Sequence, residues 1–240
     1  MAIQNIFVVG AGLMGSGIAQ TAITSGYNVV LNDQRQEALE RAKMGIENRL
    51  QHMVSKGTMS EEELKACMAR LTIDSRMTAA KDADLVVEAI FEDLDAKRSV
   101  FETLEKVCKP HTIFASNTSS ISLTALGAAT KRPERVVGMH FFSPVPKMKL
   151  VEVVFGLRTA QDVLDDVQEV GRRMGKTMIL AKDKPGFIVN RALLPMLNEA
   201  VEILDEDIGT VEDVDEGMKL GCNHPMGPLA LADMIGLDIL

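Results

Sequence analysis

Short apolar runs recur along the first three quarters of the chain, and glycine, proline or polar residues separate them. Their length and their valine and isoleucine content are typical of buried strands. Helix-like stretches stand between the early runs, and this alternation predicts βαβ units around a parallel sheet. We expect strands at residues 6–9, 28–31, 85–88, 112–115, 135–139, 150–155 and 177–181, and helices at 16–25, 36–55, 61–70 and 97–108.

The pattern changes after a polar segment that contains proline and glycine, residues 181–186. We expect no strand beyond it. Residues 188–204 carry apolar side chains at intervals of four, three and four, which predicts one face of a helix. Two more helices are expected at 211–220 and 228–235.

These patterns predict an α/β chain in which a Rossmann-type, doubly wound, mostly parallel sheet precedes an all-helical C-terminal domain. The first domain should span residues 1–184 and include a helical arm at about 36–70. The second should span residues 185–240. Residues 237–240 are mostly apolar and carry no glycine stop, so we expect this helical domain to be incomplete.

Composition narrows the class of protein. Of the 240 residues, 46% are hydrophobic and 25% charged, which excludes disorder, collagen and coiled coil. The 26 basic and 34 acidic residues give a net charge of −8, which argues against a general nucleic-acid or anionic-membrane surface. The three cysteines form no Cys-x-x-Cys pair, so neither a metal site nor a disulfide framework is expected. Without a basic leader or a membrane-length apolar stretch, the protein should be cytoplasmic.

A glycine-rich turn follows the first expected strand and consists of Gly10, Ala11, Gly12, Leu13, Met14 and Gly15. In this context Gly10 permits a tight turn, Gly12 lets a pyrophosphate approach the backbone, and Gly15 allows close helix packing. Asp33 ends the second strand, where it can accept hydrogen bonds from a ribose 2′-hydroxyl. Its charge would repel a 2′-phosphate, so NAD is favoured, although nearby Arg35 leaves NADP open as the less favoured cofactor.

A histidine and a glutamate stand at positions suited to proton transfer. His140 follows the strand at 135–139, at a carboxyl end where ligands bind in open α/β sheets. Glu152 is the one carboxylate in the apolar strand at 150–155, which the chain can reach after a reversal. A hydrogen bond from the imidazole to Glu152 would fix its tautomer and favour imidazolium. On these residues alone, a structural histidine and a strand-edge glutamate explain the pattern equally well.

Several motifs together show a family resemblance. The chain resembles the short-chain L-3-hydroxyacyl-CoA dehydrogenases, and among them the bacterial 3-hydroxybutyryl-CoA dehydrogenases, over essentially its whole length. The motifs that carry the resemblance occur in order at residues 10–15, 86–90, 115–120, 138–142, 149–153, 185–191 and 224–228.

The resemblance implies catalytic roles for four residues. It makes His140 the base and Glu152 its partner, and it places Ser119 and Asn190 around the substrate oxygen. Without it, Ser119 would be read as a loop-capping hydroxyl and Asn190 as a helix residue bonded to a neighbouring turn.

The resemblance also implies that Glu92, Lys97, Asn117 and Ser119 lie at the cofactor cleft. In isolation, Glu92 and Lys97 would form a solvated pair and Asn117 a local turn. Ser143 is a departure, because the family usually has Asn there, beside the nicotinamide. A hydroxyl at this position can keep the cofactor contact through water or weaken it.

Coenzyme A is a polyanion, and the helix at 36–55 offers a basic face for it. The residues of this face are Arg41, Gly45, Arg49, His52 and Lys56, spaced by four, four, three and four. Such a face is most often only solvated. The family, however, places coenzyme A contacts on this arm, which implies Arg49, Lys56 and Ser119 as contacts.

Taken together, the expected activity is interconversion of (S)-3-hydroxybutyryl-CoA and acetoacetyl-CoA with NAD, in fatty acid or butyrate metabolism. A homodimer formed through the helical domain is expected from the family, and an incomplete domain would impair it. Two alternatives stay open: a non-catalytic NAD-binding structural protein of the lens lambda-crystallin type, and a related sugar-acid dehydrogenase.

Overall fold

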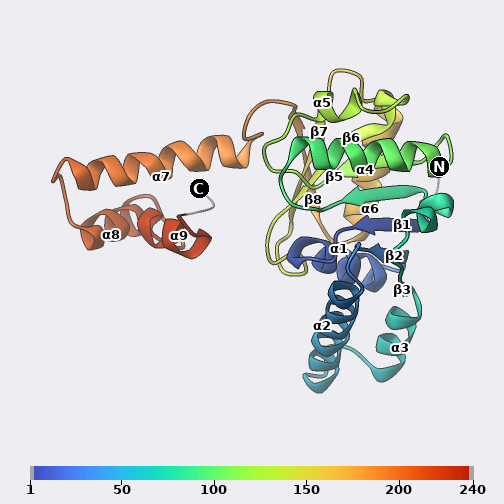
Figure 1. The fold of residues 1–240 in the computed structure, drawn as a ribbon. Helices are drawn as coiled ribbons and strands as arrows, with labels where there is room; N and C mark the ends of the chain where they lie inside the picture. Colours follow the sequence, from blue (N-terminus) through green and yellow to red (C-terminus); the bar gives the residue numbers. More distant parts are fainter. Residues whose placement is uncertain (1–2, 238–240) are drawn as a thin grey trace. The chain divides into compact units, whose positions relative to one another are not determined.

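An eight-stranded sheet forms the frame of the larger of two units in the computed structural model, which describes residues 3–237 (Figure 1). The units are Met1–Pro185 and Gly186–Leu240. The sheet has the strand order β3-β2-β1-β4-β5-β6-β7-β8. Its strands are β1 (Asn5–Val9), β2 (Asn28–Asn32), β3 (Leu71–Ile73), β4 (Leu85–Glu88), β5 (Ile113–Ser116), β6 (Val136–Phe141), β7 (Leu150–Phe155) and β8 (Thr177–Lys182).

All neighbouring strands are parallel except β6 and β7, which pair antiparallel. The predicted Rossmann-type fold class is therefore confirmed. The short β3 escaped prediction because its three residues, Leu71–Ile73, are too few to show a periodicity. Strand β1 lies between β2 and β4, so the chain winds outward from it in both directions. In sheets of this kind, the crevice at such a switch point binds ligands.

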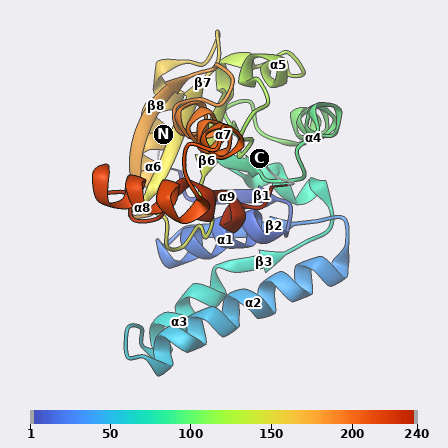
Figure 2. The ribbon, with the colours of Figure 1, turned by 90° about the vertical axis from the view of Figure 1, so that its left-hand side faces the viewer.

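Helices cover both faces of the sheet (Figures 1 and 2). Helices α1 (Leu13–Thr24) and α6 (Gln161–Arg173) share a buried cluster with strand residues such as Ile6 and Val8. Helix α4 (Leu94–Val107) packs on the opposite face. Its Phe101 ring lies 5.7 Å from that of Phe114 in β5, measured between centroids. Because the central strands are buried on both sides, they read as continuous apolar runs rather than as alternating ones.

In the first unit, two helices begin earlier than predicted, and two were missed. Helix α1 starts at Leu13, within the glycine-rich segment, and α4 starts after Asp93, whose side chain caps the Ala96 N–H at 2.8 Å. The longer missed helix is α6, although its buried Val163, Val167 and Val170 have helical spacing. The other is the short α5 (Leu123–Gly127). The unit also contains 3₁₀ turns at Met77–Asp82 and Pro133–Arg135.

A helical arm leaves the sheet between β2 and β3. It consists of α2 (Gln36–Ser55) and α3 (Glu61–Ala69), which run side by side in Figure 2. A reciprocal cap starts α3: the Glu63 N–H donates to the Ser60 hydroxyl at 3.1 Å, and the Ser60 N–H donates to the Glu63 carboxylate at 2.7 Å.

The second unit contains α7 (Val189–Asp205), α8 (Val211–Gly221) and α9 (Pro228–Ile235), and its described residues form no strand. Asp215 of α8 accepts hydrogen bonds from the Leu229 and Ala230 N–H groups at 2.8 and 3.0 Å, and so ties α8 to the start of α9. The predicted terminal segment, 237–240, falls largely outside the described residues. No helix among the described residues is long and apolar enough to cross a membrane.

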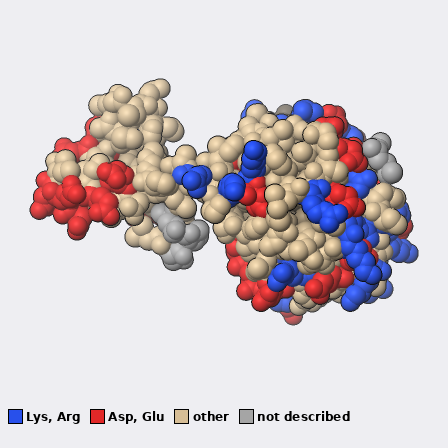
Figure 3. All heavy atoms as spheres, turned by 90° about the horizontal axis from the view of Figure 1, so that it is seen from above, with Lys and Arg blue, Asp and Glu red and all other residues tan. Residues whose placement is uncertain are grey.

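Charge is divided unequally between the units. Residues 186–240 contain 11 acidic and 2 basic residues, whereas the first 185 contain 23 acidic and 24 basic ones. Figure 3 shows Lys and Arg interspersed with Asp and Glu over the first unit and acidic side chains gathered at one end of the second. The net negative charge of the chain thus resides in the helical unit, and the first unit is free of any net repulsion toward a polyanion.

Candidate active site

The glycine turn has the geometry that a dinucleotide requires. Gly10 has a φ of +103°, and a Cβ there would lie 2.5 Å from the carbonyl oxygen of Ala89. A Cβ at Gly15 would overlap the Gly10 carbonyl oxygen. Around Gly12, by contrast, a Cβ would meet nothing within 4 Å, and this residue caps α1 without a side chain. Space and a bare helix N-terminus therefore coincide at one point, which fits a pyrophosphate.

Asp33 holds the turn as well as facing the cleft. Its carboxylate accepts the Ala11 N–H and the Arg35 N–H, both at 3.0 Å. The guanidinium of Arg35 lies 3.7 Å away and is largely exposed. Asp33 thus has a structural role in addition to the ribose contact expected of it.

A cavity of about 720 Å³ opens beside the turn. Its walls come from the ends of β1, β2 and β4 and from one face of α4, and they include Gly10, Gly12, Asp33, Met77, Phe91, Val100 and Thr103. The α4 residues Val100 and Thr103 were not predicted as site residues. The sequence offers one indication of their role. Helix α4 follows β4, which lies next to the point where the strand order reverses, and a helix in that position borders the crevice.

The antiparallel pairing of β6 and β7 sets His140 directly opposite Glu152. Imidazole Nδ1 lies 2.7 Å from Glu152 Oε2. The Glu152 side chain is fully buried, while 9% of the His140 side chain remains exposed. With Nδ1–H donating to the carboxylate, Nε2 is the nitrogen that can exchange a proton with a substrate. The contact expected between these two residues is therefore present.

Asn117 connects β5 to this pair. Its side-chain oxygen accepts the backbone N–H of Phe141, the residue after His140, at 2.9 Å. The oxygen is therefore engaged in a hydrogen bond within the protein, and the NH₂ group is the donor that Asn117 can offer to a ligand.

Glu92 organises the loop that carries Ser119. One carboxylate oxygen accepts the N–H groups of Ser119 and Ser120, at 2.9 and 3.1 Å, as well as the hydroxyl of Thr118. Burial raises the pKa of Glu92, but the Thr118 hydrogen bond and the Lys97 charge outweigh it, and the pKa is lowered overall. The ionised carboxylate is thus held against the loop that carries Ser119.

Lys97 is enclosed rather than solvated. Its side chain is 1% exposed, and the ammonium lies 2.6 Å from Glu88 and 3.3 Å from Glu92. Glu88 is fully buried at the end of β4 and also accepts the Ser116 hydroxyl at 2.5 Å. Any effect of Lys97 on the cleft therefore acts through its ion pair with Glu92. Glu88 and Ser116 were not predicted as site residues. A carboxylate at the end of an apolar strand does not indicate in the sequence which residue it will bind.

All of these groups follow the carboxyl ends of parallel strands or stand beside them, so they share one edge of the sheet. The edge combines a dinucleotide cleft with a histidine–carboxylate pair. That combination suits a proton transfer coupled to hydride transfer.

Comparison with known proteins agrees with this chemistry. The family described as 3-hydroxyacyl-CoA dehydrogenase, NAD binding domain, matches residues 5–184, and its C-terminal domain matches residues 186–240. The chain belongs to the 3-hydroxyacyl-CoA dehydrogenase family. The resemblance inferred from the motifs is confirmed, and the protein is an NAD-dependent oxidoreductase of 3-hydroxyacyl-CoA.

Individual relatives are similar over nearly the whole chain. A probable 3-hydroxybutyryl-CoA dehydrogenase of Bacillus subtilis (strain 168) is 50% identical over 99% of this chain and 83% of its own length. A 3-hydroxybutyryl-CoA dehydrogenase of Clostridioides difficile is 44% identical over 99% of this chain and 84% of its own. The crystal structure of (S)-3-hydroxybutyryl-CoA dehydrogenase from Ralstonia eutropha matches with a TM-score of 0.97 at 43% identity, covering 99% of this chain and 84% of that one.

The loop between β6 and β7 is fastened to the body of the dehydrogenase by a lysine. Ser143 is exposed in this loop. The buried ammonium of Lys176 donates to the carbonyl oxygens of Val145 and Met148 at 2.5 and 2.7 Å, and burial lowers the pKa of Lys176. Val145 packs against α1, where a Cβ at Gly17 would come within 2.9 Å of it. Lys176 was not predicted, since a single lysine before a strand resembles any solvated one.

Three further expected site residues belong to helices α2 and α7. Lys56 is exposed at the end of α2. Arg49 is bent toward α1 and donates to the Gln20 side chain at 2.5 Å, and burial lowers its pKa. Asn190 belongs to the first turn of α7 in the second unit.

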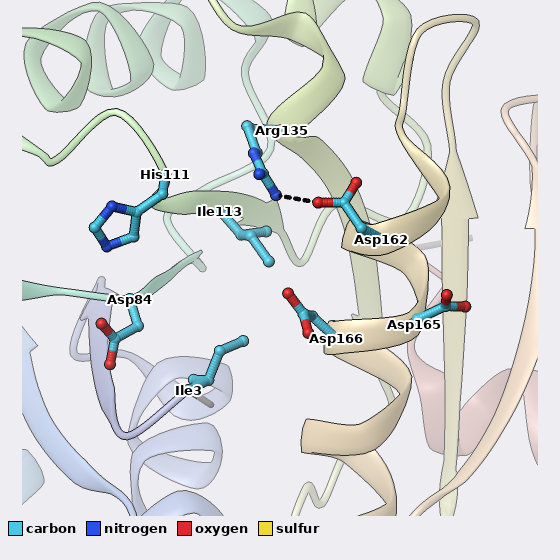
Figure 4. A pocket seen from close by; sticks show the side chains of 8 residues that line it. All are labelled: Ile3, Asp84, His111, Ile113, Arg135, Asp162, Asp165 and Asp166. Atoms are coloured by element: carbon cyan, nitrogen blue, oxygen red, sulfur yellow. Dashed lines mark hydrogen bonds and ion pairs between the residues drawn. The ribbon is translucent and has the colours of Figure 1, made fainter. Parts of the chain in front are cut away.

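A separate hollow of about 350 Å³ opens at the opposite edge of the sheet (Figure 4). It lies before the amino ends of the strands, where Arg135 pairs with Asp162 at 2.9 Å. Asp84 there accepts the N–H groups of Gln4 and Asn5, both at 2.9 Å. This hollow shares no lining residue with the dinucleotide cleft and is distinct from it.

Among residues 3–237, no group of three or more His, Cys, Asp or Glu side chains is arranged to hold a metal ion.

The buried Glu88–Lys97 pair yields a stability prediction. Glu88→Gln leaves the Lys97 ammonium without its nearest carboxylate in the interior, and breaking such a pair costs about 3–5 kcal/mol. Urea denaturation should show a loss of about that size in the free energy of unfolding. As a control, Glu216→Gln removes an exposed pair with Lys219, at 2.7 Å, and should leave the midpoint unchanged. A Glu88→Gln midpoint equal to that of the control would contradict the prediction.

Proposed function

We propose that the enzyme interconverts (S)-3-hydroxybutyryl-CoA and acetoacetyl-CoA, with His140 as general base and acid. The observation that carries the proposal is the 2.7 Å contact between His140 Nδ1 and the buried Glu152, at the edge of the sheet that bears the dinucleotide cleft. The relatives named 3-hydroxybutyryl-CoA dehydrogenase support the short acyl chain.

When bound, NAD supplies the acceptor for the hydride that leaves C3 of the hydroxyacyl group. In this direction His140 Nε2 takes the proton of the 3-hydroxyl, and the Glu152 carboxylate stabilises the resulting imidazolium. In the reverse direction the imidazolium returns that proton to the forming alkoxide. Each turnover therefore moves one hydride and one proton, and His140 exchanges its proton with water between turnovers.

Two further residues are proposed to hold the substrate oxygen where charge develops, Ser119 and Asn190. The Ser119 backbone is already fixed by Glu92, so its hydroxyl can be presented in a defined position. Asn190 is proposed from the family motif alone.

On the cofactor side, Asp33 is proposed to favour NAD over NADP, because its carboxylate lines the cavity beside the glycine turn and would repel a 2′-phosphate there. Asn117, Glu92 and Ser143 are proposed to line the nicotinamide end. Coenzyme A is proposed to contact Lys56, Arg49 and Ser119.

The proposed pathway is fatty acid or butyrate metabolism, and the proposed assembly is a homodimer formed through the helical unit. Large apolar side chains exposed on that unit support a covered surface; they include Leu194, Val201, Ile208 and Leu220.

His140 provides the direct test of the reaction. His140→Ala removes the proton carrier, so kcat for acetoacetyl-CoA reduction, followed as NADH oxidation at 340 nm, should fall about 10²–10⁴-fold. The Kd for NADH should stay within about twofold, because the imidazole lies outside the adenosine and pyrophosphate part of the cleft. Wild-type protein that binds NADH but shows no turnover would instead support a binding protein of the lambda-crystallin type.

Asp33 tests cofactor choice. Asp33→Ala removes the charge that opposes a 2′-phosphate, so the ratio of kcat/KM for NADH to that for NADPH should fall about tenfold or more. Activity with NADPH should stay below the wild-type activity with NADH, because Ala11 loses its hydrogen-bond acceptor. Asp74→Ala removes a carboxylate paired with Arg76 outside the cleft and should leave the ratio unchanged. An unchanged ratio in Asp33→Ala would refute the role.

Lys56 tests the coenzyme A surface. Lys56→Glu reverses a charge at the end of α2 and should raise KM for acetoacetyl-CoA about fivefold with little effect on KM for NADH. It is a cleaner variant than Arg49→Glu, which also breaks the contact with Gln20. Lys131→Glu makes the same charge change at an exposed residue beyond α5 and serves as the control. Equal KM values for acetoacetyl-CoA in the two variants would argue against a contact at Lys56.

A further inference from the structure

The loop that carries Ser119 is held at both ends by carboxylates. Glu92 binds its first half through the N–H groups of Ser119 and Ser120. At the other end, Asp183 accepts the hydroxyl of Ser122 at 2.7 Å and the N–H groups of Leu123 and Thr124 at 3.1 and 2.9 Å. The loop is therefore clamped from two directions.

Asp183 comes from the last segment of the first unit, between β8 and Gly186. Its own N–H donates to the carbonyl oxygen of Phe155 at the end of β7, at 3.1 Å. A second link runs beside it, because the Leu157 N–H donates to the Thr124 hydroxyl at 3.2 Å. The point at which the chain leaves for the helical unit is thus fastened to the end of the Ser119 loop.

The chemistry of this clamp calls for a carboxylate. Helix α5 has five residues, and its first-turn N–H groups need acceptors from outside the helix. Ser122 accepts the Ala125 N–H at 3.2 Å while its own hydroxyl donates to Asp183. Both carboxylate oxygens of Asp183 accept hydrogen bonds. An asparagine would replace one of these oxygens with an NH₂ group, which would face an N–H or O–H donor instead of accepting from it. Burial raises the pKa of Asp183, but these hydrogen bonds outweigh it and lower the pKa overall.

We propose that Asp183 is a positioning residue of the dehydrogenase reaction, which acts by fixing the Ser119 loop from the segment that leads to the helical unit. The proposal rests on the role proposed above for Ser119. A catalytic group displaced by about 1 Å can lose about 10² in rate, so a loosened loop should lower turnover. Binding of NADH should change little, because the cavity beside the glycine turn is built by β1, β2, β4 and α4 and not by this loop.

The test uses Asp183→Asn in the full chain. Its kcat for acetoacetyl-CoA reduction should fall about tenfold, and its Kd for NADH, from fluorescence titration, should stay within about twofold. Asp84→Asn is the matched control, since Asp84 likewise accepts two backbone N–H groups, at the opposite edge of the sheet. It should leave both constants unchanged, whatever the change in melting temperature. A wild-type kcat in Asp183→Asn, or an equal loss in Asp84→Asn, would overturn the proposal.

A double-mutant cycle with Ser119→Ala separates this proposal from the role of Ser119 itself. If Asp183 acts through Ser119, Asp183→Asn should change kcat less than about twofold in the Ser119→Ala background. Losses that multiply would overturn the proposal for Asp183 and leave Ser119 its role. A wild-type kcat in Ser119→Ala would remove the role of Ser119 and the proposal with it. Should Asp183→Asn fail to fold, Ser122→Ala deletes one bond to the same carboxylate and is judged by the same criteria.

Discussion

The buried carboxylate of Glu88 is the interaction on which the cleft depends. It stands at the end of a central strand and binds the ammonium of Lys97 from α4 and the hydroxyl of Ser116 from β5. Two charges without solvent are tolerated only while they neutralise each other, so β4, β5 and α4 must keep their relative positions. Lys97 in turn lies 3.3 Å from Glu92, which fixes the loop of Ser119. An interior ion pair thereby sets the wall of the cofactor cavity and the position of a proposed substrate contact.

The single antiparallel pairing in the sheet has a chemical consequence. A strictly parallel β7 would need a long crossover, whereas the reversal after β6 returns the chain at once and sets Glu152 opposite His140. The cross-strand pair holds the two side chains on one face at 2.7 Å without any loop to position them. A pair proposed to transfer protons is thus carried by strands, which hold side chains in place more precisely than loops do.

The acidic residues that give the chain its net negative charge are concentrated in one of the two units. The helical unit holds 11 acidic and 2 basic residues, while the sheet unit is nearly neutral. The net charge of the unit that carries His140 therefore does not repel a polyanionic acyl-CoA, and Lys56, its proposed contact, belongs to the same unit. The clamp at Asp183 lies at the boundary of the sheet unit, so the path of the chain toward the acidic unit and the position of Ser119 share one support.

The sequence by itself determined the elements that leave a pattern among neighbouring residues. The apolar runs of β1 and β4 and the glycines at 10, 12 and 15 follow from burial and backbone sterics, and the order of motifs identifies the family. Tertiary structure alone decided which partner each buried polar group has. Glu88, Ser116, Lys176 and Asp183 resemble ordinary strand-end or surface residues along the chain, because a hydrogen bond between residues far apart in sequence leaves no periodicity in either segment. Their roles appear only when the sheet brings those segments together, since an unpaired polar group in the interior is too costly to persist.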